Sequence, residues 1–203
     1  MAVKFERTGM LLIISGPSGT GKGTLVKKLM DSDPSFRFSC SVTTRKPRDN
    51  EIEGVHYHFV TEEAFDRLVS ENAFLEHATV HGHRYGTLRA PVERMMAEGY
   101  NVLLDIDPQG AITVMQNAAD YVSVFILPPS FEELRVRLHT RNTDDPVEIE
   151  RRLKNARGEV QKIDRYQYAV VNDNLELAFA QLQSIANAEK HRTTRFHPHI
   201  AEK

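Results

Sequence analysis

Residues 16–24 read GPSGTGKGT and lie between an apolar run at residues 11–14 and a helical pattern that begins at Leu25. A G-x-x-x-x-G-K loop between a strand and a helix lets backbone N–H groups and the helix dipole converge on phosphate. A ligand-free glycine turn is the alternative, but the strand, the lysine and the helix together favour a phosphate site. We predict contacts to a nucleoside triphosphate from Gly16, Pro17, Ser18, Gly19, Thr20, Gly21, Lys22, Gly23 and Thr24, with Lys22 catalytic at the terminal phosphates.

A second group of polar residues suits a phosphate monoester. Residues 41–48 (SVTTRKPR) place Arg45 and Arg48 three positions apart, directly after a run of hydroxyl side chains. Arginine forks bind phosphate oxygens in pairs, and the hydroxyls of Tyr57 and Tyr85 can donate to the same group. A solvated basic loop is the alternative, but Pro47 and the two threonines favour a fixed loop.

Glu76, in the segment 74–76 (FLE), is a candidate for reading a base. A carboxylate can accept the two neighbouring N–H groups of guanine, whereas adenine lacks both, and an unpaired polar site rejects the wrong ligand strongly. A solvated strand glutamate is the alternative, and the surrounding motifs argue against it.

A metal ion is expected with the triphosphate, although one position departs from the usual loop. Gly23 stands where a Ser or Thr normally supplies a hydroxyl to Mg²⁺. Thr24 is the candidate hydroxyl, and Asp105, at the end of a predicted strand, is the candidate carboxylate. Without Thr24, phosphate oxygens, water and one carboxylate suffice, because Mg²⁺ keeps much of its water shell.

Four apolar segments are expected to form the sheet that positions these groups: residues 10–15, 102–105, 122–127 and 169–171. Strands that are apolar throughout are typical of a parallel sheet with helices on both faces. Asp107 before Pro108 predicts a helix start, and residues 130–133 (SFEE) form a capping box. The pattern predicts an α/β fold with three layers, of the P-loop NTPase type.

Two segments depart from the parallel pattern. Residues 38–42, 56–60 and 74–80 resemble half-exposed strands, with a helix at 62–71, which predicts an inserted α+β subdomain of antiparallel character. Residues 139–147 form a polar loop between helices and suit a lid. We therefore expect a single domain, residues 1–203, with a core (1–37, 89–135 and 160–203), a monophosphate-binding insert (38–88) and a helical lid (136–159).

Together with residues 104–110 (LDIDPQG), these motifs make the chain resemble a guanylate kinase over nearly its whole length. The resemblance implies transfer of phosphate from ATP to GMP, and also dGMP, with Mg²⁺. It implies a GMP site made by Ser41, Arg45, Arg48, Tyr57, Glu76, Tyr85, Thr87 and Asp107. Thr87 stands where many relatives have serine. The resemblance further implies catalytic roles for Arg45 and for the lid arginines Arg137, Arg141 and Arg152, and an adenine-side position for Asn172.

Alternatives remain for the function. One is a catalytically silent guanylate-kinase-like interaction module; such modules tend to lose parts of the phosphate loop, which is intact here. Another is a kinase of a different small phosphate ester on the same fold, which the combination of Ser41, Glu76 and Thr87 disfavours. For each lid arginine, an exposed helix face that pairs with nearby glutamates is the alternative.

Composition narrows the class of protein. The chain has 203 residues, with 26 Lys and Arg against 28 Asp and Glu, which argues against a broad nucleic-acid or anionic-membrane surface. Cys40 is the single cysteine, and no signal-peptide pattern is found, so a cytoplasmic location is expected. Residues 193–203 are expected to be a loosely ordered tail.

Overall fold

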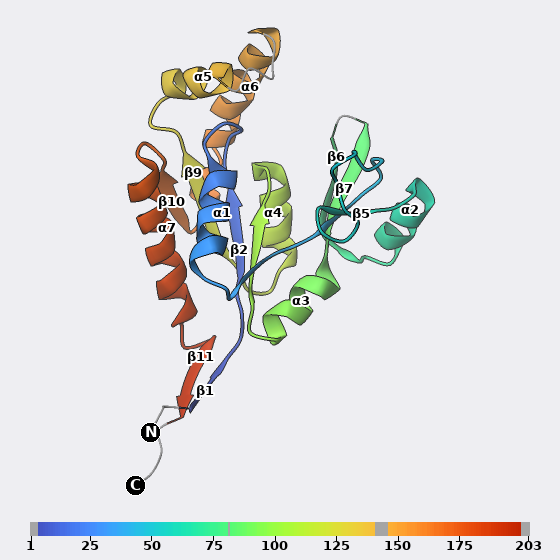
Figure 1. Ribbon diagram of the computed structural model, residues 1–203, viewed down its shortest axis with the longest axis vertical. Coiled ribbons are helices and arrows are strands. Elements are labelled where there is room, and N and C mark those ends of the chain that lie inside the picture. Colours follow the sequence, from blue (N-terminus) through green and yellow to red (C-terminus); the bar gives the residue numbers. More distant parts are fainter. Residues whose placement is uncertain (1–3, 81, 141–145, 200–203) are drawn as a thin grey trace.

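The computed structural model describes residues 4–80, 82–140 and 146–199, and Figure 1 shows the arrangement of its elements. In these ranges the strands are β1 (Lys4–Arg7), β2 (Leu11–Ser15), β3 (Phe36–Phe38), β4 (Ser41–Thr43), β5 (Tyr57–Phe59), β6 (Phe74–Val80), β7 (His83–Leu88), β8 (Asn101–Asp105), β9 (Val122–Leu127), β10 (Tyr168–Val171) and β11 (Phe196–His199). The helices are α1 (Lys22–Ser32), α2 (Glu62–Ser70), α3 (Arg89–Ala97), α4 (Pro108–Asn117), α5 (Phe131–Thr140), α6 (Pro146–Val160) and α7 (Leu175–Lys190), with a 3₁₀ turn at Ile163–Arg165.

The core is the predicted parallel sheet. Within the described residues its strand order is β10-β9-β2-β8-β3, and every neighbouring pair is parallel. Successive side chains of the fully buried strand β2 point to opposite faces. Leu12 and Ile14 pack in the cluster that includes residues of α1 and α7, whereas Leu11 and Ile13 pack with residues of α3 and α4. The prediction of three layers is confirmed.

Local capping fixes where two of the helices begin. The Asp107 carboxylate accepts from the backbone N–H groups of Gln109 and Gly110, at 2.7 and 3.0 Å, and Pro108 occupies the first turn of α4. Ser130 Oγ accepts from the Glu133 N–H at 3.0 Å and begins α5. Both predicted helix starts are confirmed, because these side chains satisfy N–H groups that the first helical turn leaves unpaired.

The insert is a separate unit with its own small core. Its strands have the order β5-β4-β7-β6 within the described residues, and Phe65 of α2 stacks on Phe74 with ring centroids 4.7 Å apart. The expected antiparallel character holds for the β4–β7 and β6–β7 pairs, whereas β4 and β5 are parallel. The single strand expected at 38–42 was wrong. The chain leaves the parallel sheet after β3, where the Ser39 N–H donates to Leu103 O, and enters the insert as β4.

The lid helices α5 and α6 pack on each other through Leu134, Leu138, Ile149 and Leu153. Figure 1 shows them projecting from the sheet, with the insert lying to one side of the core. The predicted lid loop lies between the end of α5 and the start of α6, and residues 141–145 are outside the described ranges. Among the described residues, no helix combines the length and the apolar composition needed to cross a bilayer.

The expectation of a loose C-terminal tail was wrong for residues 193–199. Strand β11 pairs antiparallel with β1. Just before it, Arg195 is only 1% exposed and makes two hydrogen bonds to Asp120, at 2.9 and 2.7 Å, and one of 2.6 Å to Glu189. A buried arginine needs such carboxylate partners, and these partners hold the end of the chain against the core.

Candidate functional site

The loop between β2 and α1 has the backbone shape that the glycine spacing predicts. Gly16 and Gly21 have φ values of 137° and 88°, which favour glycine. A Cβ on Gly16 would also lie 2.2 Å from Ile126 O, so a larger residue would displace the loop from β9. Lys22 Nζ donates to the carbonyl oxygens of Gly16 and Pro17, at 2.7 and 3.0 Å. The lysine therefore lies across the loop at the start of α1.

A cavity opens beside the loop, with a volume of about 290 Å³. It is lined by Gly19, Gly21, Thr24, Arg137, Asn172, Asp173 and Leu175. Arg137 of α5 donates to Asn172 O at 2.8 Å and to Glu133 at 2.9 Å. The structure thus brings Arg137, Asn172 and Thr24 to one cavity, which we call the loop cavity.

Arg152 of α6 approaches the same loop from the lid. Its guanidinium donates to Ser18 Oγ at 3.2 Å and to Glu148 at 3.1 Å. Hydrogen bonds from Arg151 and Arg152 lower the pKa of Glu148 to about 2. Because the Glu148 carboxylate stays ionised, it holds the Arg152 side chain along α6, and the Arg152 guanidinium reaches the loop. Arg141, the other predicted lid arginine, lies outside the described residues.

A second cavity, of about 190 Å³, lies between the insert and the core; we call it the acceptor cavity. Its lining comes from the insert (Ser41, Tyr57, Glu76, Ala78 and Tyr85) and from the end of β8 and the segment after it (Asp105, Ile106, Asp107 and Gly110). Residues predicted from separate motifs therefore meet in one place. Asp107 both lines this cavity and caps α4, so its two predicted roles are compatible.

Glu76 forms the buried end of the acceptor cavity. It is 8% exposed, and its Oε1 accepts from the Thr87 hydroxyl at 2.8 Å. Burial raises the pKa of Glu76, the Asp107 charge adds to this, and hydrogen bonds from Thr87 oppose it. A Cβ on Gly110 would lie 3.4 Å from Glu76 Oε2, so α4 begins with no side chain in front of the carboxylate. The carboxylate can accept further donors from one flat ligand, whereas the Thr87 hydroxyl already donates its hydrogen to Glu76.

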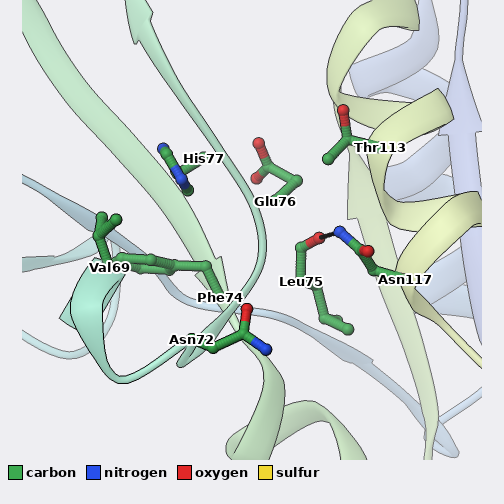
Figure 2. A pocket seen from close by; sticks show the side chains of 8 residues that line it. All are labelled: Val69, Asn72, Phe74, Leu75, Glu76, His77, Thr113 and Asn117. Atoms are coloured by element: carbon green, nitrogen blue, oxygen red, sulfur yellow. Dashed lines mark hydrogen bonds between the residues drawn. The ribbon is translucent and has the colours of Figure 1, made fainter.

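Strand β6 holds Glu76 in place through a contact with α4. Figure 2 shows Glu76 in a small side cavity at this junction, where Asn117 donates to Leu75 O at 2.9 Å. Leu75 is buried in the core cluster on the α3 and α4 side of the sheet. Glu76 is thus tied to the core as well as to the insert.

Two tyrosines, Tyr57 and Tyr85, also line the acceptor cavity, and the Arg45 side chain lies beside Tyr57. The Tyr57 and Tyr85 rings lie 5.8 Å apart, and the Arg45 guanidinium lies 5.6 Å from the Tyr57 ring centre. Arg45 donates to Glu51 at 2.7 Å, and Glu51 also accepts the Arg48 N–H at 2.8 Å. The Arg48 side chain is exposed on the same loop. These tyrosine hydroxyls and arginine side chains together suit a dianionic phosphate.

Asp105 lines the acceptor cavity and lies beside the phosphate loop. Its Oδ2 is 3.7 Å from the position that a Cβ on Gly23 would take. Burial raises the pKa of Asp105, and the nearby Lys22 charge opposes this. Among the described residues, no three His, Cys, Asp or Glu side chains are grouped to hold a metal. A carboxylate beside a phosphate loop nevertheless fits Mg²⁺, which takes its other ligands from phosphate and water.

Three residues near the site were missed from the sequence. Glu51 lies three positions after Arg48, but an acid in a basic loop carries no distinctive pattern. Gly110 is one of eleven glycines in the chain. Glu159 has a raised pKa because of burial, and the charges of Lys22 and Asp107 also act on it. Glu159 follows Arg152 by seven positions, so helical spacing could have placed both on one face of α6.

Comparison with known proteins agrees with this geometry. The guanylate kinase family model matches residues 8–189. The chain is 46% identical to a guanylate kinase of Clostridium perfringens over 197 residues, covering 97% of this chain and 91% of that protein. It is 48% identical to a guanylate kinase of Rhizobium etli over 196 residues, covering 96% and 89%.

A solved structure extends the agreement to three dimensions. The crystal structure of guanylate kinase from Anaplasma phagocytophilum matches with a TM-score of 0.74 and 36% identity, covering 95% of this chain and 92% of that one. With the acceptor cavity and the phosphate loop both beside Asp105, and with relatives that match along nearly the whole chain, the protein belongs to the guanylate kinase family.

Proposed function

We propose that this protein transfers the γ-phosphoryl group of ATP to GMP, and also to dGMP, yielding the nucleoside diphosphate. The observation that carries the proposal is the buried carboxylate of Glu76, which lines the acceptor cavity together with Ser41 and accepts a hydrogen bond from Thr87 behind it. Guanine would present N1–H and its amino group to the Glu76 carboxylate and O6 to a hydroxyl donor such as Ser41, which is the edge that distinguishes guanine from adenine. We also expect the protein to act in the cytoplasm.

The transfer needs alignment and charge neutralisation more than covalent help. The phosphate of GMP would bind at Arg45, Arg48, Tyr57 and Tyr85, with Ser41 and Asp107 at the nucleoside. The attacking oxygen is already anionic near neutral pH, so no general base is required. ATP would bind along residues 16–24 with Lys22 at its β and γ phosphates.

The lid arginines supply further positive charge. Arg152 already contacts the phosphate loop through Ser18, and Arg137 lines the loop cavity. With Arg141, they would cover the transferring group and exclude water when both substrates are present. Coupling this closure to the acceptor limits transfer to water.

Mg²⁺ would be held beside Asp105, with Thr24 as a further candidate ligand, and would neutralise charge on the ATP phosphate oxygens. Asp105 lines the acceptor cavity and Thr24 lines the loop cavity. Because Gly23 offers no hydroxyl next to Asp105, the carboxylate is the stronger of the two candidates. An Asp105→Asn variant should weaken Mg²⁺ dependence of ATP binding, measured by calorimetry with and without the ion.

Release of ADP in a coupled assay with GMP, dGMP, AMP and CMP tests the proposal. We expect turnover with GMP and dGMP and little with AMP or CMP. A catalytically silent interaction module would release no ADP with any of the four nucleotides. A kinase of another phosphate ester would also release none with these four, but would release ADP with its own acceptor. Lys22→Ala should abolish turnover and leave GMP binding intact, because Lys22 acts on the triphosphate. Lys27→Ala, on the exposed face of the same helix, is the matched control.

A further inference from the structure

Asn172 makes an unusual set of contacts for a residue at the rim of a ligand cavity. It follows β10 directly, is 5% exposed, and donates its backbone N–H to Leu127 O at the end of β9, at 2.8 Å. Its side-chain Nδ2 donates to Thr20 O in the phosphate loop, also at 2.8 Å. The carboxamide therefore joins the sheet to the loop.

The packing around Gly21 shows how closely the loop fits this side chain. Gly21 has a φ of 88°, and a Cβ added there would lie 2.4 Å from Asn172 Nδ2. The amide thus occupies the space that any other residue at position 21 would need. Position 21 therefore needs a glycine for two reasons: the positive φ of the loop backbone and the close approach of the Asn172 side chain.

The first lid helix, α5, contacts the same residue. Arg137 of α5 donates to Asn172 O at 2.8 Å. On the same helix, Leu134 and Leu138 pack so close to Gly19 that a Cβ there would lie 3.0 and 2.9 Å from them. One residue therefore contacts the sheet, the phosphate loop and the first lid helix.

We propose that Asn172 is a positioning residue for ATP, which sets the direction of the loop N–H groups and links them to α5. This inference rests on the proposed function. The Thr20 carbonyl and the Gly21 N–H belong to one planar trans peptide, so they point in opposite directions. Fixing the carbonyl toward Asn172 fixes the Gly21 N–H on the other side of the loop. A buried carbonyl without a donor would instead favour rotation of this peptide.

The informative variant is Asn172→Asp, which keeps the size and shape of the side chain. When ionised, the new carboxylate cannot donate, and it faces the Thr20 oxygen. We expect the KM for ATP to rise at least about fivefold at pH 8, in line with an unsatisfied buried acceptor, and the KM for GMP to change less than about twofold. When protonated, the carboxyl can donate again, so the ratio to wild type at the same pH should fall between pH 8 and pH 6. Burial brings this titration toward neutral pH.

Asn174→Ala is the matched control. Asn174 lies two positions later and caps α7 by accepting from the N–H groups of Glu176 and Leu177, so its loss destabilises the same segment without touching the loop. The inference is overturned if Asn174→Ala raises the KM for ATP as much, if both substrates are affected equally, or if the defect of Asn172→Asp is independent of pH. Calorimetry can compare ATP binding by the wild type and both variants without any turnover. If the proposed reaction itself were wrong, the wild type would show no transfer to GMP, whatever the binding data show.

Discussion

Glu76→Gln separates guanine recognition from the rest of the site. The carboxylate is buried, and one of its oxygens already accepts from Thr87. In the variant, the amide oxygen can keep the Thr87 bond, and the amide N–H₂ then faces the guanine N1–H and amino donors. Two charge-assisted hydrogen bonds are replaced by donors that oppose each other. The GMP phosphate and the ATP site are untouched by the change.

The size of the effect follows from those bonds. A hydrogen bond to a charged group contributes about 1.5–3 kcal/mol, and about 1.4 kcal/mol corresponds to a tenfold change in affinity. We therefore expect the Kd and the KM for GMP to rise about 10- to 150-fold, toward the upper end because a donor is left facing donors. The KM for ATP should stay within about twofold. Adenine N1 can accept from the new amide, so the preference for GMP over AMP should shrink.

The same variant has an opposite expected effect on stability. The pKa of Glu76 is raised because of burial, so the folded state holds the proton more strongly than the unfolded state. The free energy of unfolding therefore falls as pH rises from the ordinary glutamate pKa through the raised one. At neutral pH, Glu76→Gln should keep or raise the Tm while GMP use declines.

Steady-state kinetics with each substrate varied, calorimetry with GMP and thermal unfolding at pH 7 make the test. Glu71→Gln, on the exposed end of α2, is the control for the loss of one negative charge in the insert. An equal loss of ATP and GMP affinity, or an unchanged preference for GMP over AMP, would refute the assignment of Glu76 to the base.

Two further predictions concern ion pairs. Glu51→Ala should raise the KM for GMP with little effect on the KM for ATP, because Arg45 loses the carboxylate that orients it. Glu53→Ala, which leaves the Arg45–Glu51 pair intact, is the control. An unchanged or lower KM for GMP in Glu51→Ala would contradict this role. Asp33→Asn should lower the unfolding free energy by about 1–2 kcal/mol at pH 7. Burial tends to raise the pKa of Asp33, but hydrogen bonds from Lys190 and Ser35 outweigh it and lower this pKa to about 2. The stabilisation that Asp33 gives the folded state is therefore present above pH 3.8 and is lost as pH falls toward 2. Urea unfolding of both proteins from pH 7 to 2 would show the gap closing, and a constant gap would argue against the mechanism.

Much of the fold could be predicted because its determinants are local. Strand β2 is apolar at every position but the last, Gly16, Gly19 and Gly21 have the positive φ that favours glycine, and Asp107 caps the helix that follows it. The acceptor residues Glu76 and Tyr85 were found through the motifs of the family. They could not be placed in one cavity by spacing alone, since the pairing of β6 and β7 brings them together.

The parts that could not be predicted depend on distant partners. Phe36 and Val42 are both buried, in different sheets, and nothing in the segment between them marks the change. Arg195 looks like a surface arginine until Asp120 and Glu189 are placed around it. The side chain of Asn172 was expected near the adenine, and its bond to Thr20 exists only because β10 ends beside the loop.

Because β1 and β11 pair with each other, the two ends of the described chain emerge together, at the opposite end of the molecule from the lid helices (Figure 1). Affinity tags or fusion partners at either end should therefore leave access to both substrates open. Removing residues from the C-terminal end has a different effect. A chain that ends before Arg195 would leave the Asp120 and Glu189 carboxylates without the Arg195 guanidinium. Such a truncation should therefore yield a protein that unfolds at a lower temperature.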